Sequence, residues 1–261
     1  MNGLQIFSLQ GKTALVAGAS RGIGLAIAQL MARSGARTIL AARSLDHLKS
    51  HAGELVQEGH KAEAAALDIT SPESIEQLCA AHPEIDILVN VSGTNIRRRF
   101  EKYTPEEYDK IMTTNLHGFM RLTQRVGGRM VERGKGGTIV SIGSLMSVAG
   151  LPYITVYAMT KSALAGLTRS LASEWGQHNI QVNCIAPGFI ITTLNQDMWQ
   201  PEVMRNWLKG VQANPRTGTP EDIAPLAVFL SGPGSDYITG QVIAADGGYT
   251  TTAVWPFAPP E

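Results

Sequence analysis

The stretch "TALVAGASRGIGLAIAQLMARSG", residues 13–35, decides the fold. Its first five residues are apolar or β-branched and predict a strand, and the alanines and leucines after the turn predict a helix. Gly18, Gly22 and Gly24 lie between them. A strand that turns tightly into a helix leaves the first helical N–H groups unpaired and aimed at one point, where an anion is favoured. Because the spacing GxxxGxG is not the GxGxxG fingerprint, these glycines alone leave both a pyrophosphate site and ordinary turn chemistry open.

The same alternation of strand and helix continues along the chain. The predicted strands are residues 13–17, 38–42, 62–67, 85–89, 137–142, 180–185 and 241–245. The predicted helices are residues 24–35, 71–81, 104–134, 156–176 and 219–232. Strands that alternate with helices form a parallel sheet covered on both faces, so we expect an α/β fold with a seven-stranded parallel sheet.

The domain organisation is predicted to be simple. The 261 residues contain no internal repeat and no low-complexity linker, and α/β folds often use this length for one core, so residues 1–261 are expected to form a single domain. Residues 192–218 break the alternation and are interpreted as a lid over a site. The proline-rich tail, residues 250–261, cannot continue a helix or a central strand; it is either loose or reaches a neighbouring subunit.

The balance of charge excludes some classes of partner. Lysine plus arginine equals aspartate plus glutamate at 22 each, so no global field attracts nucleic acid or a membrane surface, and a small-molecule substrate is expected. The sequence has neither a secretory signal nor an apolar run of about 18 residues, which predicts a cytoplasmic protein. Cys79 and Cys184 fall within a predicted helix and strand and are interpreted as buried thiols, so no metal site is predicted.

The end of the second predicted strand bears on the choice of cofactor. A carboxylate there would bind the ribose 2′-hydroxyl of NAD and repel a 2′-phosphate, but residues 41–44 read Ala-Ala-Arg-Ser. Arg43 can pair with a phosphate through two N–H groups, and Arg21 in the glycine turn points to the same place. The residues therefore favour NADP(H) over NAD(H); the alternative is two solvated surface arginines.

Four polar residues form a candidate catalytic set. Tyr157 and Lys161 lie one turn apart on a predicted helix, where a neighbouring ammonium would lower the pKa of a phenol that is otherwise near 10. Ser144 follows the fifth strand, at the edge of the sheet where ligands bind. Asn115 stands within a helical pattern, a position that asparagine disfavours unless its side chain has another partner. The alternative for the tyrosine and lysine is an amphipathic pair on a solvated face.

These residues, together with "GASRGIG", Asp68, "DILVN", "PGFIITT" and "ITGQVIAADGG", occur in the order and spacing of the short-chain dehydrogenase/reductase family. The chain resembles that family from about residue 11 to about residue 249. The resemblance implies a Rossmann-like, doubly wound domain that transfers a hydride to or from a nicotinamide. It also implies a homotetramer, with the helices after Thr104 and Val156 and the terminal segment at interfaces.

The resemblance further assigns roles to single residues. Tyr157 would donate or accept the proton, Lys161 would hold the nicotinamide ribose and lower the tyrosine pKa, and Ser144 would fix the substrate carbonyl oxygen. Asn115 would anchor a water in a proton relay. Asp68 would contact adenine, and Ile190 and Thr192 would hold the carboxamide. The expected cofactor-binding residues are Gly18, Ser20, Arg21, Gly22, Ile23, Gly24, Arg43, Ser44, Asp68, Ile69, Asn90, Ser92, Gly93, Tyr157, Lys161, Pro187, Gly188, Ile190 and Thr192.

Two positions depart from the family pattern. Ala17 stands where the family usually has threonine, and residues 90–93 read Asn-Val-Ser-Gly instead of Asn-Asn-Ala-Gly. Val91 lacks the amide that normally helps to hold the cofactor, while Ser92 adds a hydroxyl beside it. Neither change touches the four candidate catalytic positions.

The substrate is suggested by the segment after the fourth strand. "NIRRRF", residues 95–100, brings three arginines to the site, where they can clamp a carboxylate or simply form a solvated turn or a subunit contact. Residues 93–118 are similar to those of gluconate 5-dehydrogenases and related sugar-acid dehydrogenases. That similarity implies a keto sugar acid or polyol, with Arg97 or Arg98 as the carboxylate ligand. The expected substrate residues are Arg97, Ser144, Met146, Tyr153, Tyr157 and Met198.

Two other functions remain open at this point. Met146, Tyr153, Met198, Trp199 and Trp207 favour an apolar pocket, and hence a carbonyl reductase of bulky apolar ketones or 3-ketoacyl substrates. The fold could also serve as a non-catalytic cofactor-binding subunit, although the intact set of four polar residues argues against it.

Overall fold

A computed structural model describes residues 5–193 and 195–252, and within them a seven-stranded sheet forms the centre of the molecule. Its strands are β1 (Thr13–Ala17), β2 (Arg37–Ala42), β3 (Ala62–Ala66), β4 (Ile87–Asn90), β5 (Gly137–Ile142), β6 (Ile180–Pro187) and β7 (Val242–Ala245). They are parallel and follow the order β3-β2-β1-β4-β5-β6-β7. The predicted α/β fold and its seven-stranded parallel sheet are confirmed.

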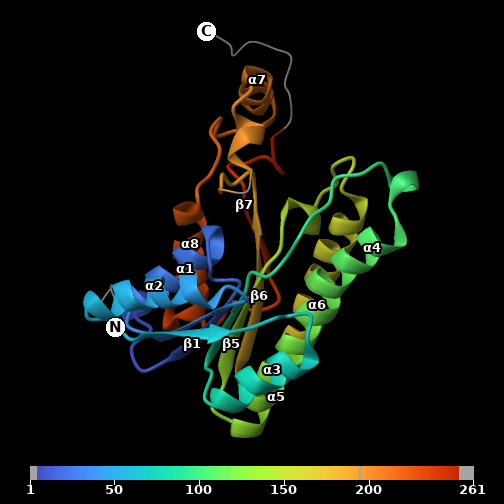
Figure 1. Cartoon of the computed structure of the whole chain (residues 1–261). Helices are drawn as coiled ribbons and strands as arrows, with labels where there is room; N and C mark the ends of the chain where they lie inside the picture. Colours follow the sequence, from blue (N-terminus) through green and yellow to red (C-terminus); the bar gives the residue numbers. More distant parts are fainter. Residues whose placement is uncertain (1–4, 194, 253–261) are drawn as a thin grey trace.

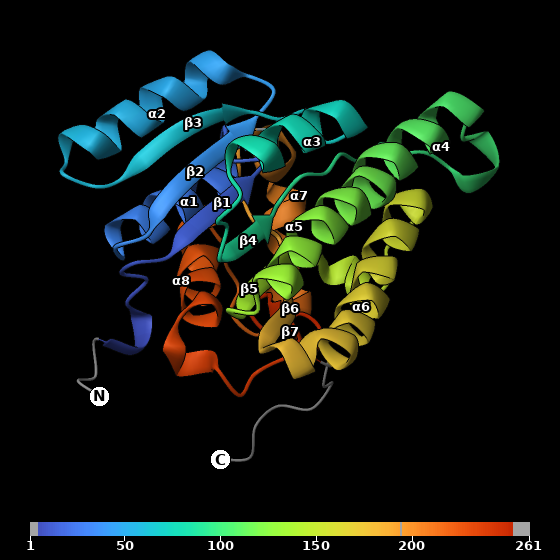
Figure 2. The same cartoon turned by 90° about the horizontal axis from the view of Figure 1, so that it is seen from below.

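Helices cover both faces of the sheet. They are α1 (Gly22–Arg33), α2 (Leu45–Gln57), α3 (Pro72–Ala81), α4 (Pro105–Met112), α5 (Phe119–Arg133), α6 (Thr155–Trp175), α7 (Glu202–Val211) and α8 (Pro220–Ser231). α1, α2 and α8 lie on one face, and α3, α5 and α6 lie on the other (Figures 1 and 2). Each face has its own apolar core, one containing Ile27 and Val228 and the other Leu78 and Leu122.

The strand order reverses direction between β1 and β4. From this point the chain winds outward on both sides, so the loops after β1 and β4 separate and leave a crevice at the carboxyl ends of the strands. The registers pair Ala17 with both Ala41 and Asn90, and Asn90 with Ser141, so the ends of four neighbouring strands are level. Residues that follow these ends are therefore brought together.

The helices differ from the prediction in three places, one of which is α7, within the segment predicted to be a lid. α2 was not predicted, because its buried stripe of Leu48, Ala52 and Leu55 is narrow and the rest of the segment is polar. The single helix predicted over residues 104–134 is divided by a π-helical turn, Thr113–Gly118, between α4 and α5. A Cβ on Gly118 would lie 2.1 Å from the Ile69 carbonyl oxygen, so this turn packs directly against the loop after β3.

The segment predicted to be a lid projects beyond the carboxyl ends of the strands. It contains a 3₁₀ turn, Gln196–Trp199, and α7, which stands at the top of the molecule in Figure 1. A β-bridge between Ile190 and Gly218 closes its base. Of the predicted tail, only residues 250–252 are described; residues 253–261 lie outside the described part of the chain.

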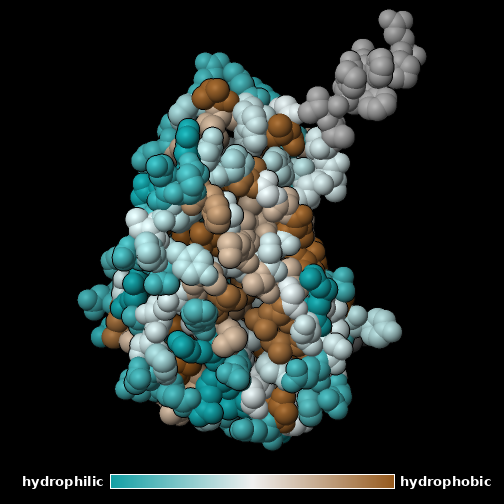
Figure 3. Space-filling view, turned by 90° about the vertical axis from the view of Figure 1, so that its right-hand side faces the viewer, coloured by the Kyte–Doolittle hydropathy of each residue, from teal (hydrophilic) through white to brown (hydrophobic). Residues whose placement is uncertain are grey.

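The side of the molecule formed by α4 and α6 carries apolar groups. They gather down the middle of this face in Figure 3, and the exposed apolar side chains on α4, α5 and α6 include Tyr108, Met120 and Met159. Cys79 and Cys184 are buried free thiols, as predicted. Among the described residues, no helix combines the length and apolar composition that a bilayer span requires.

Candidate active site

The glycine turn after β1 has the backbone that its sequence predicts. Gly18 and Gly22 adopt positive φ angles of 91° and 56°, which other residues rarely adopt. A Cβ on Gly18 would lie 3.1 Å from the Ser92 nitrogen, and one on Gly24 would lie 2.2 Å from the Gly18 oxygen. Arg21 caps α1 without a side-chain hydrogen bond to the helix, so the first N–H groups of α1 are not capped by it. The turn therefore has the open backbone that an anion requires.

Arg43 and Asp68 interact electrostatically at the side of the crevice formed by β2 and β3. Arg43 directly follows β2 and is exposed, and Asp68 follows β3. The pKa of Asp68 is lowered, first by hydrogen bonds from the Thr70 side chain and backbone and also by the charge of Arg43. Asp68 and Arg43 are therefore close enough to interact. The other residues predicted for this side, Ser20, Ile23, Ser44 and Ile69, also follow strand ends at this edge of the sheet.

Asn90 ends β4 and is fully buried. Its Oδ1 accepts the Ser92 backbone N–H at 3.3 Å. Its Nδ2 has no hydrogen-bond partner in the part of the chain that the structure describes. A buried donor without a partner is costly, so a ligand in the crevice would find a free N–H group here.

Asn115 lies in the π-helical turn and is fully buried. Its Oδ1 accepts the Thr94 N–H at 2.7 Å, and its Nδ2 donates to the Thr94 oxygen at 2.8 Å and to the Thr160 hydroxyl at 3.3 Å. Thr160 in turn donates to the Tyr157 carbonyl oxygen. This asparagine therefore links the loop after β4 to α6, which accounts for its place within a helical segment.

Tyr157, Lys161 and Ser144 converge at the start of α6. The ammonium of Lys161 lies 5.7 Å from the centre of the Tyr157 ring and donates to the Ile142 carbonyl oxygen at 2.8 Å. The side chain of Ser144 is close enough to the Tyr157 hydroxyl to lower its pKa as a hydrogen-bond partner. A Cβ on Gly93 would lie 3.5 Å from Asn115 Oδ1 and 3.6 Å from Lys161 Nζ. The structure thus brings the four predicted residues together from three separate segments of the chain, since Tyr157 and Lys161 are both on α6.

The pKa of Tyr157 does not move in the predicted direction. Burial raises it, and the hydrogen bond with Ser144 only partly opposes that rise. Burial also lowers the pKa of Lys161 to about 8. Burial therefore dominates the tyrosine pKa in the protein alone, where the Lys161 ammonium donates to a backbone carbonyl. That the lysine lowers the tyrosine pKa stays a prediction.

Ser147 is a residue of the site that the sequence did not indicate. Its hydroxyl accepts the Ser144 N–H at 3.2 Å and donates to the Lys161 carbonyl oxygen at 2.9 Å. Nearby, Ser162 donates to the Met146 carbonyl oxygen at 2.8 Å. These bonds attach the turn that carries Ser144 to the helix that carries Tyr157.

The loop after β6 faces the glycine turn. A Cβ on Gly22 would lie 3.3 Å from the Thr192 side chain, so the two predicted cofactor segments are adjacent. Asn195, which was not predicted, accepts the Thr192 N–H at 2.8 Å and donates to the Ile190 oxygen at 2.8 Å. Pro187 ends β6, and the Gly188 N–H donates to the Ala245 oxygen of β7. The loop after β6 is therefore held at one end by β7 and at the other by the side chain of Asn195.

The three arginines of "NIRRRF" have different partners. The guanidinium of Arg98 forms an ion pair with Glu107 on α4, and the backbone N–H of Arg98 donates to the Tyr153 carbonyl oxygen at 2.8 Å. Arg97 crosses to the lid, where its Nη1 lies 3.2 Å from the Met198 sulfur. Among the described residues, Arg97 has no carboxylate within ion-pair distance. Of the two predicted carboxylate ligands, Arg97 is therefore the one left unpaired.

The predicted apolar residues divide between the mouth and the interior. Tyr153 is 51% exposed and has a left-handed backbone with φ of 67°, a conformation that bulky residues rarely adopt. Met146 is buried in a small core that includes Leu145 and Ile154 and touches Tyr157. Met146 therefore supports the tyrosine from behind and presents little surface to a substrate.

An aromatic cluster forms the base of the lid. Phe189 lies 5.3 Å from Trp199, 5.4 Å from Trp207 and 5.1 Å from Tyr249, measured between ring centres. Phe189 and Tyr249 also pack against the small core that touches Tyr157. The lid is thus attached to the candidate catalytic residues through apolar contacts.

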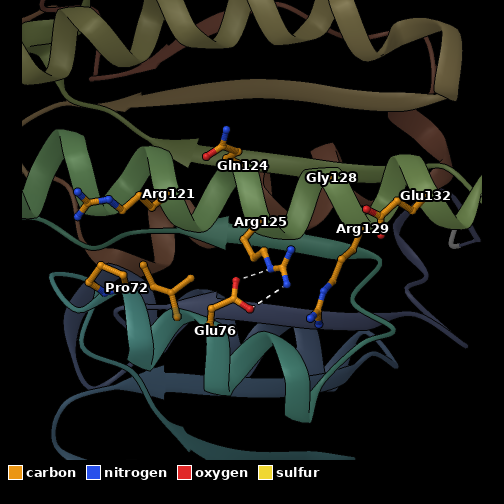
Figure 4. Close-up of a pocket in the computed structure, with 9 residues that line it drawn as sticks. Pro72, Glu76, Arg121, Gln124, Arg125, Gly128, Arg129 and Glu132 are labelled. Carbon is orange, nitrogen blue, oxygen red and sulfur yellow. Dashed lines mark hydrogen bonds and ion pairs between the residues drawn. The ribbon is translucent and has the colours of Figure 1, made fainter.

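The surface has two hollows, of which the first is lined in part by the predicted cofactor residues Gly188 and Ile190. One, of about 330 Å³, adjoins Gly188 and is bounded by Gln212, Arg216 and Asp246. The other, of about 340 Å³, lies between α3 and α5 (Figure 4). Arg121, Arg125 and Arg129 follow one side of it, and Arg125 pairs with Glu76 across it. None of the predicted site residues lines the second hollow.

Comparison with known proteins agrees with this geometry. A protein-family model described as enoyl-(acyl carrier protein) reductase matches residues 18–250. Gluconate 5-dehydrogenase of Gluconobacter oxydans is 37% identical over 95% of this chain and 98% of its own length. The 2-dehydro-3-deoxy-D-gluconate 5-dehydrogenase of Bacillus subtilis is 40% identical over 93% and 96%. The structure of a gluconate 5-dehydrogenase from Burkholderia cenocepacia in complex with NADP and tartrate superimposes with a TM-score of 0.90 at 32% identity, covering 96% of this chain and 99% of that one.

Proposed function

The chain belongs to the short-chain dehydrogenase/reductase family of oxidoreductases, and from this premise we propose that it transfers a hydride between NADP(H) and a keto sugar acid or the corresponding alcohol. The observation that carries the proposal is the convergence of Asn115, Ser144, Tyr157 and Lys161 at the carboxyl edge of the sheet. Structures of relatives contain NADP, and several of the sequence relatives are named for sugar acids.

The crevice has the features that a dinucleotide needs. Gly18 lets the turn pack against the Ser92 backbone, the start of α1 favours a phosphate, and the buried Nδ2 of Asn90 offers a donor. When bound, the nicotinamide supplies or accepts the hydride. Arg43 and Arg21 support a preference for NADP(H), because their guanidinium groups can pair with a 2′-phosphate and residues 41–44 at the end of β2 contain no acid to oppose it.

The protein's own residues handle the proton and the carbonyl. In the direction of reduction, Tyr157 would donate its hydroxyl proton to the carbonyl oxygen, and the Ser144 hydroxyl would hold that same oxygen. Lys161 would hold the nicotinamide ribose, and its charge would stabilise the tyrosinate that remains. Asn115 would anchor the water that returns a proton to Lys161.

Arg97 is proposed to bind the carboxylate of the substrate. Its guanidinium reaches the lid, where the Met198 thioether is its partner. Arg97→Ala should therefore lower kcat/KM for a keto sugar acid about 10- to 100-fold, since a hydrogen bond to a charged group contributes about 1.5 to 3 kcal/mol. A neutral ketose of similar size should be affected little. Initial rates with both substrates measure the difference.

Arg99→Ala is the matched control, because Arg99 is the neighbouring exposed arginine and also lacks an ion-pair partner among the described residues. It should leave both rates near those of the unaltered enzyme. Equal losses with the anionic and the neutral substrate in Arg97→Ala would contradict the clamp.

The aromatic cluster of Phe189, Trp199, Trp207 and Tyr249 favours a second candidate function, the reduction of bulky apolar ketones. Absorbance of NADPH and NADH, followed in both directions with keto sugar acids, polyols and bulky ketones, distinguishes the two. Turnover of the sugar acids supports the arginine clamp. Turnover of apolar ketones alone would make the lid the element that selects the substrate.

We further propose that the enzyme acts in the cytoplasm as a homotetramer. The apolar side chains exposed on α4, α5 and α6 support burial of that face against a second copy (Figure 3). Light scattering should give four times the chain mass, and cell fractionation should recover the protein with cytoplasmic markers. A monomer at micromolar concentration would contradict the assembly. Met120→Lys on this face should lower the mass.

A further inference from the structure

Met198 carries a thioether that is exposed beside a candidate substrate residue. It lies in the 3₁₀ turn of the lid and is 36% exposed. Met120 and Met159 are the other exposed methionines among the described residues, at 43% and 46%. Of these three sulfurs, that of Met198 accepts a hydrogen bond within the described residues, and the donor is Arg97 at 3.2 Å.

The backbone around Arg97 is held in place on both sides. The Tyr103 hydroxyl donates to the Ile96 oxygen at 2.6 Å, and the Arg98 N–H donates to the Tyr153 oxygen at 2.8 Å. The side chain of Arg97 is therefore delivered to the mouth from a fixed position. Its partner there, a thioether, is a weak acceptor, so a substrate carboxylate can displace it readily.

We propose that Met198 is a site of reversible oxidation that controls the arginine clamp. A hydroperoxide transfers one oxygen atom to the Met198 sulfur: its O–O bond breaks, an S–O bond forms, the sulfur loses two electrons and hydrogen peroxide is reduced to water. The product is a sulfoxide, whose polar oxygen is a far stronger acceptor than the thioether. This inference rests on the proposed function, because it concerns the residue assigned to the substrate carboxylate.

The sulfoxide oxygen would hold Arg97 on the lid. A hydrogen bond from a guanidinium to this oxygen is charge-assisted and competes with the carboxylate for the same N–H groups. Oxidation should therefore raise KM for a keto sugar acid about tenfold, while kcat and the KM for a neutral ketose change little. Tyr157 and Ser144 belong to a different segment and keep their contacts.

The test uses the full-length enzyme treated with hydrogen peroxide. Peptide mass spectrometry measures the sulfoxide at Met198, Met120 and Met159, and initial rates give KM for a keto sugar acid and a neutral ketose. The rise in KM should follow conversion at Met198. Methionine sulfoxide reductase should reverse it, and a thiol reductant alone should not, which separates it from oxidation of Cys79 or Cys184.

Two variants make the test specific. Met198→Leu conserves volume and removes the sulfur, so its KM should not respond to peroxide, whereas Met120→Leu should respond like the unaltered enzyme. An unchanged KM after complete conversion of Met198, or an equal rise in Met198→Leu, would overturn the inference. Failure of Met198 to convert at peroxide concentrations that oxidise the methionine of a short, unfolded peptide would also overturn it.

The untreated enzymes separate this inference from the proposed function. If the untreated Arg97→Ala variant loses kcat/KM for the sugar acid but not for the neutral ketose, the clamp is supported, independently of the effect of peroxide. If the clamp is present and peroxide leaves it intact, only the oxidation site is wrong. If untreated Arg97→Ala shows no selectivity, the proposed carboxylate ligand is wrong, and the inference fails with it.

Discussion

Tyr157→Phe should lower turnover by about 10²- to 10⁴-fold while NADPH still binds, because general acid catalysis by a positioned side chain contributes about that much. The substitution removes one hydroxyl and keeps the ring that packs beside Phe189 and Met146. Initial rates give the loss, and a titration of NADPH fluorescence gives the affinity. Tyr108→Phe, an exposed tyrosine on α4, is the control and should keep full activity.

Full activity of Tyr157→Phe would refute the proton-transfer role. A non-catalytic cofactor-binding subunit, the third function that the sequence left open, would give a different result. A protein that binds NADPH but turns over none of the carbonyl substrates, with or without the tyrosine hydroxyl, would be a cofactor-binding subunit.

The pH dependence should follow from the same two groups. Burial raises the pKa of Tyr157, so the phenol is protonated at neutral pH and ready to act as an acid in reduction. Alcohol oxidation needs the tyrosinate, and its rate should rise as the pH increases above neutral. Lys161, with a pKa of about 8, is charged below that value and loses its charge above it. When the rates are plotted against pH, reduction and oxidation should therefore slope in opposite directions in the unaltered enzyme. Both slopes should disappear in Tyr157→Phe.

The sheet could be predicted from the sequence because each strand is a short apolar run between turns. Helix α2 could not be predicted in the same way. Its core contacts use Leu48, Ala52 and Leu55, and a stripe of three residues is weak beside the polar residues that surround it. The strand order also depends on tertiary pairing, which no local pattern encodes.

The candidate catalytic residues could be proposed because they form a pattern along the chain, whereas the residues that position them do not. Ser147 and Asn195 act through hydrogen bonds to backbone atoms of other segments. Serine and asparagine at such positions are ordinary turn residues in a sequence. Phe189 and Tyr249, which are 60 positions apart, meet only through the fold.

The sign of the tyrosine pKa shift depends on burial and could not be obtained from spacing. The separation of Tyr157 and Lys161 correctly placed them on one face of a helix. It gave no information on desolvation, which acts on both groups and outweighs their mutual attraction in the protein alone.

Ala42→Asp combined with Arg43→Ala should shift the preference from NADPH toward NADH by about 10²- to 10⁴-fold in the ratio of kcat/KM values. The change removes a guanidinium that can pair with the 2′-phosphate and places a carboxylate at the end of β2. Each effect is worth about 1.5 to 3 kcal/mol, and 1.4 kcal/mol corresponds to a factor of ten. The carboxylate should also accept a hydrogen bond from the ribose 2′-hydroxyl of NADH.

The design of this test depends on where Ala42 and Arg43 lie. Ala42 is partly buried and pairs in register with Ala66, so Arg43→Ala alone, at an exposed position, guards against a folding defect in the double variant. That single variant should weaken NADPH and leave NADH nearly unchanged. Lys49→Ala, an exposed basic residue on α2, controls for the general loss of positive charge. An unchanged NADPH/NADH ratio in both Arg43 variants would mean that the 2′-phosphate is bound elsewhere, with Arg21 as the next residue to replace.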